Sequence, residues 1–178
     1  NGADAPRSGQ IATNYWPRKY LLPSVDLFAG TGGSDRKWVL IRTAELYLNY
    51  AEAQNEAAGP AAEVYDALNA IRSRAGMPGI SGGTKETLRE KIRHERRIEL
   101  ALEDHRFWDV RRWKTAQQAD NTEVHGVAVT GTGNVSYSYP VIEKRVFDPG
   151  KNYWLPIPQS EMDKVSSQNP DFTQNKGW

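Results

Sequence analysis

The stretch that decides the fold runs from Arg93 to Trp113 and reads RHERRIELALEDHRFWDVRRW. Charge this dense usually marks a solvated surface, but its helical phase indicates otherwise. At about 100° per residue, Glu95 and Glu99 fall on one helical stripe. That stripe also carries the apolar residues Leu88, Ile92 and Leu102. Because a carboxylate on a core-facing stripe needs a cationic partner or a function, the stretch holds either a buried ion-pair network or an active site.

Outward from this stretch, hydrophobic periodicity predicts four helices over 37–116. The first covers 37–58 and ends at Gly59-Pro60, and the second covers about 61–75 and is capped by Gly76. The third follows the N-cap residue Thr84 and extends to about Asp104, and the fourth covers 105–116. Residues 1–36 lack periodicity, and we expect an irregular lead-in there.

Beyond Asp120 the pattern changes to short alternating segments. Residues 124–130 and 135–139 predict strands around a glycine turn, 141–147 predicts another, and a short helix is expected near 159–165. The predicted fold class is therefore mainly α, with an irregular or β excursion near 121–157. We expect one domain over 1–178, in which 117–178 holds short strands, the short helix and a tail. The first two helices partly match a tetratricopeptide unit.

Composition excludes several classes of protein. A net charge of +1 argues against nucleic-acid binding, which needs a clear basic excess. No apolar run is long enough for a transmembrane helix, and the first residues lack the pattern of a signal peptide. The absence of cysteine excludes disulfides and thiolate metal sites.

Glu95 and Glu99 admit two interpretations. Their i, i+4 spacing places the Cβ atoms about 5–6 Å apart, close to the carboxyl separation of a retaining glycosidase. However, both project from one side of one helix toward a packed neighbour, where a sugar ring has no room. We therefore expect no enzyme, with a glycosidase using these two residues as a distant alternative. The favoured interpretation is a buried ion-pair network, whose arginines we expect to be Arg96, Arg106, Arg111 and Arg112.

Metal sites fail on spacing. His94-Glu95 begins a His-Glu-x-x-His zinc motif, but the second histidine is replaced by Ile98. A di-iron Glu-x-x-His motif fails because Arg106 stands three residues after Glu103. We predict no metal and no cofactor.

Tyr15-Trp16, in a loop-like segment, is the best local candidate for a ligand platform. Exposed aromatic faces stack on the apolar faces of sugar rings, while neighbouring polar groups bind the hydroxyls. The alternative is that both rings pack on the helical core.

Four blocks of sequence resemble the C-terminal half of the SusD/RagB family of outer-membrane nutrient-binding lipoproteins. Residues 38–56 read WVLIRTAELYLNYAEAQNE, and residues 67–76 read ALNAIRSRAG. Residues 92–113 resemble the family signature Glu-Arg-Arg-x-Glu-Leu-x-x-Glu-x-x-Arg-x-x-Asp-x-x-Arg-Trp. LPIPQSE at 155–161 and the closing residues 169–178 resemble the usual ending. The order and spacing of the blocks make the resemblance specific.

The resemblance implies a helical fold with tetratricopeptide-like units and no catalysis. It also implies binding of a glycan or other nutrient polymer at the cell surface. The ligand would then pass to a SusC-like TonB-dependent transporter in the outer membrane. Attachment to that membrane would be through a lipid anchor that this cysteine-free chain does not carry. A helical-repeat scaffold that binds only proteins is the alternative function.

Overall fold

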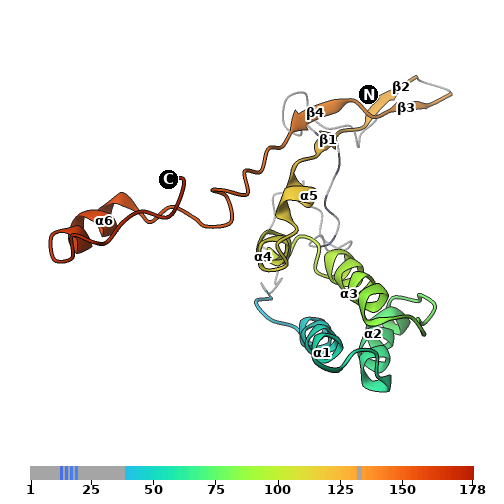
Figure 1. Ribbon diagram of the computed structural model, residues 1–178. Coiled ribbons are helices and arrows are strands. Elements are labelled where there is room, and N and C mark those ends of the chain that lie inside the picture. The colour runs from blue at the N-terminus through green and yellow to red at the C-terminus, as the bar shows by residue number, and fades with distance from the viewer. Residues whose placement is uncertain (1–12, 14, 16, 18, 20–38, 132–133) are drawn as a thin grey trace, which may run out of the picture. The chain divides into compact units, whose positions relative to one another are not determined.

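The computed structural model describes residues 13, 15, 17, 19, 39–131 and 134–178. The chain divides into two compact units, one over Leu22–Phe107 and one that combines Asn1–Leu21 with Trp108–Trp178. In the described residues, six helices and two small two-stranded sheets confirm the mainly α prediction (Figure 1). The assignment of 1–178 to one domain stays a prediction.

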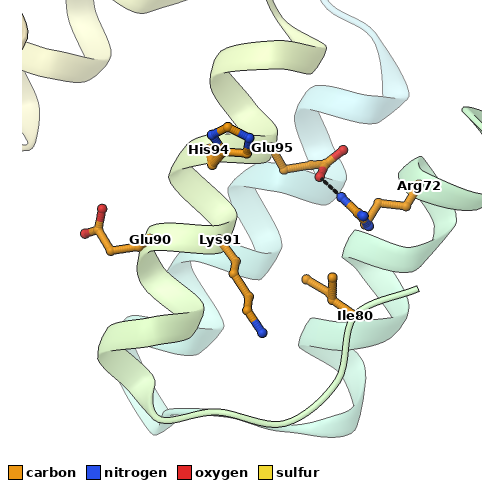
Figure 2. A pocket seen from close by; sticks show the side chains of 6 residues that line it. All are labelled: Arg72, Ile80, Glu90, Lys91, His94 and Glu95. Carbon is orange, nitrogen blue, oxygen red and sulfur yellow. Dashed lines mark hydrogen bonds and ion pairs between the residues drawn. The ribbon is translucent and has the colours of Figure 1, made fainter. Parts of the chain in front are cut away.

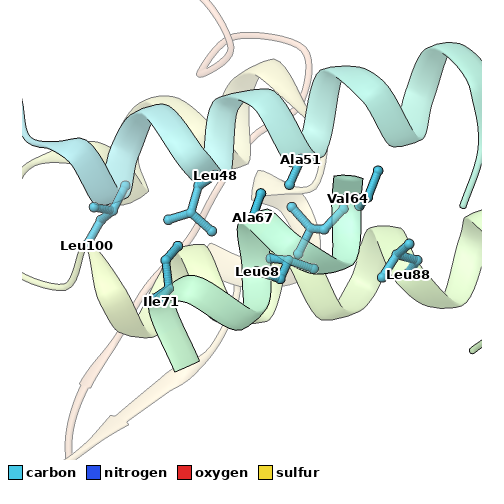
Figure 3. Close-up of a cluster of buried hydrophobic side chains, with 9 residues drawn as sticks. Leu48, Ala51, Val64, Ala67, Leu68, Ile71, Leu88 and Leu100 are labelled. Carbon is cyan, nitrogen blue, oxygen red and sulfur yellow. The ribbon is translucent and has the colours of Figure 1, made fainter. Parts of the chain in front are cut away.

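Three helices lie wholly within the first unit: α1 (Thr43–Ala58), α2 (Ala62–Arg74) and α3 (Lys85–Glu99). Helix α1 ends as predicted at Gly59, whose φ of 82° favours glycine and whose N–H reaches the carbonyl of Asn55 at 2.9 Å. Helices α1 and α2 form a hairpin with this short link (Figure 3). Helix α1 begins at Thr43, six residues after the start at 37 that the hydrophobic pattern predicts.

The ends of α3 are set by two different devices. Thr84 is the N-cap as predicted, and its hydroxyl accepts from the N–H of Thr87 while the Thr87 hydroxyl accepts from the N–H of Thr84. The helix stops at Glu99, before the predicted Asp104. Leu102 and Asp104 have φ angles of 65° and 62°, which a right-handed helix cannot contain. Leu102 is consequently 57 % exposed, and its predicted place on the core stripe is wrong.

The core of the first unit lies where the three helices meet (Figure 3). Its apolar side chains are nearly or fully buried and come from all three helices and the residue after α3. They are Leu48, Ala51, Val64, Ala67, Leu68, Ile71, Leu88, Ile92 and Leu100. Burial of each large side chain contributes about 1.5–3 kcal/mol. The helical stripes of the sequence therefore located most of this core.

Polar contacts join the end of α1 to the start of α3. Buried Asn55 donates through Nδ2 to the carbonyl of Lys85 at 3.0 Å. Arg89 donates to both carboxylate oxygens of Glu56, from Nε to Oε1 at 2.5 Å and from Nη2 to Oε2 at 2.6 Å. These contacts bring the last turn of α1 against the first turn of α3.

At the other end of α3, three arginines hold two carboxylates. Arg72 Nη1 lies 2.6 Å from Glu95 Oε2, and Glu95 is only 8 % exposed. Glu99 Oε1 lies 2.6 Å from Arg42 Nη1 and 2.7 Å from Arg74 Nη2. We call these five residues the arginine clamp. It joins the last turns of α2 and α3 to the residue that precedes α1.

Among the three arginines of the clamp, Arg42 makes the largest number of hydrogen bonds. Its Nε donates to Glu103 at 2.8 Å, and its Nη2 donates to the main-chain carbonyl of Glu99 at 2.6 Å. The second bond satisfies a carbonyl at the end of α3 that the helix leaves without a partner. The hydrogen bond to Glu103, followed by that to Glu99, raises the pKa of Arg42 despite its partial burial. Arg42 therefore stays charged at all physiological pH values.

The second unit contains the rest of the helices and the sheets. Helix α4 (His105–Arg112) crosses the boundary between the units and is followed by α5 (Ala116–Asp120). Strand β1 (Glu123–His125) pairs antiparallel with β4 (Val141–Lys144), and β2 (Ala128–Thr130) with β3 (Ser136–Ser138). Helix α6 (Gln159–Ser166) confirms the short helix predicted near the end. A small core forms around Val110, Ala116 and Phe147.

We expect Glu99→Gln to destabilise the fold. Removing one member of a buried ion pair costs about 3–5 kcal/mol. The effect should lie at the low end of that range because Arg74 is largely exposed. Urea unfolding measures it, with Glu90→Gln as the control, since the exposed Glu90 should change stability by less than about 0.5 kcal/mol. A Glu99→Gln variant that unfolds at the wild-type urea concentration would show that the clamp is not structural.

We also expect a defined pH dependence at Glu56. Its hydrogen bond from Arg89 lowers the pKa of Glu56. The stability it contributes is therefore present above its unfolded-state pKa and is lost as the pH falls through the lower folded-state pKa. Glu56→Gln should lower the free energy of unfolding at pH 7, and the difference from wild type should shrink below about pH 4. Urea unfolding at several pH values tests this, and a difference that does not change with pH would contradict it.

Candidate functional site

The carboxylates of Glu95 and Glu99 face guanidinium groups. Glu95 is held by Arg72, and Glu99 by Arg42 and Arg74. A glycosidase needs one carboxyl group that can protonate a leaving oxygen and another that can reach the sugar. Carboxylates bound this closely to arginine are poorly placed for either task. The geometry thus favours the ion-pair interpretation of these two residues.

The identified partners of the carboxylates differ from those that we expected. Arg96 is buried as a network member should be, but its Nη1 donates to Asn49 Oδ1 on α1 at 2.6 Å. Arg112 pairs with Asp109 at 3.0 Å in its own helix, and the Arg111 guanidinium lies 5.5 Å from the Phe147 ring centroid. Arg106 is exposed on α4. The membership of Arg106, Arg111 and Arg112 in the network stays a prediction.

Sequence reasoning missed Arg42, Arg72 and Arg74. All three lie at helix ends: Arg42 is the residue before α1, and the other two are in the last turn of α2. Their charges were a visible signal. Their contact with α3, however, depends on the path of residues 75–84, which brings the last turns of α2 and α3 together.

A solvent-open pocket of about 440 Å³ lies beside the clamp, between α2, α3 and the loop that joins them (Figure 2). Arg72 and Glu95 form one wall through their ion pair, and Ile80 of the loop forms another. The remaining lining residues come from one face of α3 and are Glu90, Lys91 and His94. The pocket combines five ionisable side chains with one apolar side chain.

The predicted aromatic platform is only partly described. Tyr15 is exposed, and its main-chain N–H lies 3.3 Å from the hydroxyl of Thr13. Trp16 lies outside the described residues. The proposed role of the pair as a ligand platform stays a prediction.

A second pair of exposed aromatic rings lies near the C-terminal end of the described chain. The indole Nε1 of Trp178 donates to the main-chain carbonyl of Trp154 at 2.9 Å, and the residues are 45 % and 65 % exposed. Lys151 Nζ lies 4.0 Å from the Trp178 ring centroid, and Lys114 Nζ lies 5.8 Å from that of Trp154. We call these rings the C-terminal tryptophan pair. Sequence reasoning missed it because the two rings are far apart along the chain.

The described residues contain no group of three or more His, Asp or Glu side chains that could hold a metal ion. Within that same part of the chain, none of the helices has the length and apolar character needed to cross a membrane.

Comparisons with known proteins give a consistent family. A model of the SusD family matches residues 1–178. SusD-like protein P2 of Formosa agariphila is 30 % identical over 154 residues, which are 80 % of this chain and 27 % of that protein. A SusD-like protein of Bacteroides fragilis superimposes with a TM-score of 0.69 at 36 % identity, over 79 % of this chain and 26 % of that one.

Two further solved structures agree. A SusD-like carbohydrate-binding protein of Bacteroides fragilis has a TM-score of 0.57 at 36 % identity, over 67 % of this chain and 26 % of that one. A SusD homologue of Bacteroides thetaiotaomicron has a TM-score of 0.57 at 33 % identity, over 79 % and 27 % of the two chains. This chain spans about a quarter of the length of these relatives, a smaller share than the half that the resemblance suggests. The match over all 178 residues shows that the chain belongs to the SusD family.

Proposed function

We propose that this chain is part of a protein that binds a glycan or another nutrient polymer and hands it to a SusC-like TonB-dependent transporter. The observation that carries the proposal is membership of the SusD family over the whole chain. One relative with 36 % identity is a SusD-like carbohydrate-binding protein, which supports glycan as the ligand. In this proposal the protein lies at the outer-membrane surface and is held there by a lipid anchor.

Binding without bond cleavage fits the chemistry of the two carboxylates. Hydrolysis of a glycosidic bond needs a proton donor and a second carboxylate placed on either side of that bond. Here Glu95 and Glu99 project from one helix into arginine side chains. SusD-family proteins are non-catalytic, and this arrangement agrees with that property.

The C-terminal tryptophan pair supplies a means of contact with sugar. Indole faces stack on the C–H faces of pyranose rings, and this contact needs exposed rings in a fixed orientation. Trp154 and Trp178 are both exposed, and the hydrogen bond between them limits the movement of the Trp178 indole. Lys151 Nζ lies over one face of the Trp178 ring, which leaves the other face for a sugar. Lys114 Nζ lies over the Trp154 ring at the longer distance of 5.8 Å and supplies hydrogen-bond donors beside it.

A protein-interaction scaffold is the second candidate, and the outer face of α1 favours it. Leu46, Tyr47 and Tyr50 are exposed on this helix although all three have large apolar surfaces. Such surfaces are common at contacts with other proteins.

We expect Trp154→Ala to weaken glycan binding by about two- to tenfold, the worth of one aromatic contact. The fold should persist because Trp178 bonds to the main-chain carbonyl of residue 154, which the substitution keeps. Retention in affinity gels that contain different glycans measures the change. Leu155→Ala is the matched control, because it removes a neighbouring exposed apolar side chain without an aromatic face.

The same gels distinguish the other interpretations. Loss of retention in Trp16→Ala, but not in Trp154→Ala, would move the contact to the predicted Tyr15-Trp16 platform. Failure of the wild type to bind any glycan in the panel would count against the proposed function and leave the scaffold as the better account.

A further inference from the structure

The pocket beside the arginine clamp has the size of a ligand site. Its volume of about 440 Å³ lies within the range of about 300–1,000 Å³ that small-molecule sites occupy. Neither the Tyr15-Trp16 platform nor the C-terminal tryptophan pair includes any residue that lines this pocket.

Two of the charges in this pocket are already balanced. The carboxylate of Glu95 is neutralised by Arg72 at 2.6 Å. Glu90 is exposed and pairs with Arg93, which follows it by one turn, at 3.3 Å. The acidic lining residues therefore contribute little net negative charge to the pocket.

Lys91 and His94 differ from the other lining residues. Neither side chain makes a hydrogen bond or ion pair with any residue that the structure describes. They are three positions apart on α3, so their side chains lie on neighbouring parts of one helix face (Figure 2). The lysine ammonium group offers three donors and no acceptor, and the imidazole offers at least one donor. The pocket thus presents unpaired donors and one unbalanced positive charge.

The opposite wall is held in place before any ligand arrives. Ile80 exchanges two hydrogen bonds with Asn69 of α2, N–H to Oδ1 at 2.7 Å and carbonyl to Nδ2 at 3.1 Å. Arg72 Nε also donates to the carbonyl of Pro78 at 2.8 Å. A wall fixed in this way lowers the ordering cost of binding and presents an apolar surface opposite the donors.

We propose that this pocket binds the anionic group of an acidic sugar, a carboxylate or a sulfate. Lys91 and His94 donate to its oxygens, and Ile80 contacts the C–H face of the ring. Both anions accept hydrogen bonds and donate none, which complements the donors of Lys91 and His94. The inference rests on the proposed function and narrows its ligand to acidic glycans.

Affinity gels with the 178-residue chain test the inference. The probes are polygalacturonate, dextran sulfate and neutral dextran, and the last two differ only in sulfate. We expect Lys91→Gln and His94→Gln each to weaken retention by an acidic glycan by about tenfold or more, the worth of a hydrogen bond to a charged group. Retention by dextran should not change. Whichever of polygalacturonate and dextran sulfate shows the loss identifies carboxylate or sulfate as the group bound.

Arg97→Gln is the matched control. It removes one positive charge from an exposed position of the same helix, outside the pocket lining. An equal loss of retention in this control would show general charge attraction and overturn the inference. Wild-type retention by dextran alone would also overturn the inference, but the proposed function would then stand. No retention by any of the three probes would overturn the inference, and the wider glycan panel would then decide whether the proposed function stands. Matching urea midpoints show that the variants are folded.

Discussion

The rest of the first unit depends on the arginine clamp, in which Arg42, Arg72 and Arg74 hold the carboxylates of Glu95 and Glu99. Only 8 % of Glu95 is exposed, and an unpaired carboxylate at such a position would be costly. A buried ion pair seldom adds much net stability compared with an apolar pair, but removing one partner is expensive. We therefore infer that the clamp favours the observed arrangement of the helices, since this arrangement pairs both carboxylates. The same bonds fix Arg72 and Glu95 as a wall of the neighbouring pocket.

Local patterns in the sequence predicted the helices and most of the core. Leu48, Leu68 and Ile92 lie on regular helical stripes, and all three are buried in the structure. The prediction failed at Leu102, because positive φ angles after α3 end the helix that the stripe assumed. The partners of Glu95 and Glu99 could not be found in the same way. Whether a charge at the end of α2 faces α3 depends on how the intervening loop turns, and helical phase within one element carries no information about that path.

The candidate sites show the same division between local and long-range information. Lys91 and His94 were within reach of a pattern argument because they are one turn apart on α3. The wall opposite them was not, because Ile80 is held by Asn69, eleven residues away on another helix. The C-terminal tryptophan pair brings together residues 24 positions apart. The family was identifiable from blocks in a fixed order, and those blocks include Arg42, Arg72 and Arg74. The residues that identify the family are thus largely those that hold the fold together.

If the carboxylates of α3 have a structural role, Arg72 and Glu95 contribute to stability jointly. A double-mutant cycle measures this coupling, from the free energies of unfolding of the wild type, Arg72→Met, Glu95→Gln and the double variant. The two side chains are in direct contact, so the account predicts strong non-additivity, with a coupling energy of about 1–3 kcal/mol. The double variant should be less destabilised than the sum of the single variants, because it leaves neither charge buried alone. Free energies that add within about 0.5 kcal/mol would contradict the account.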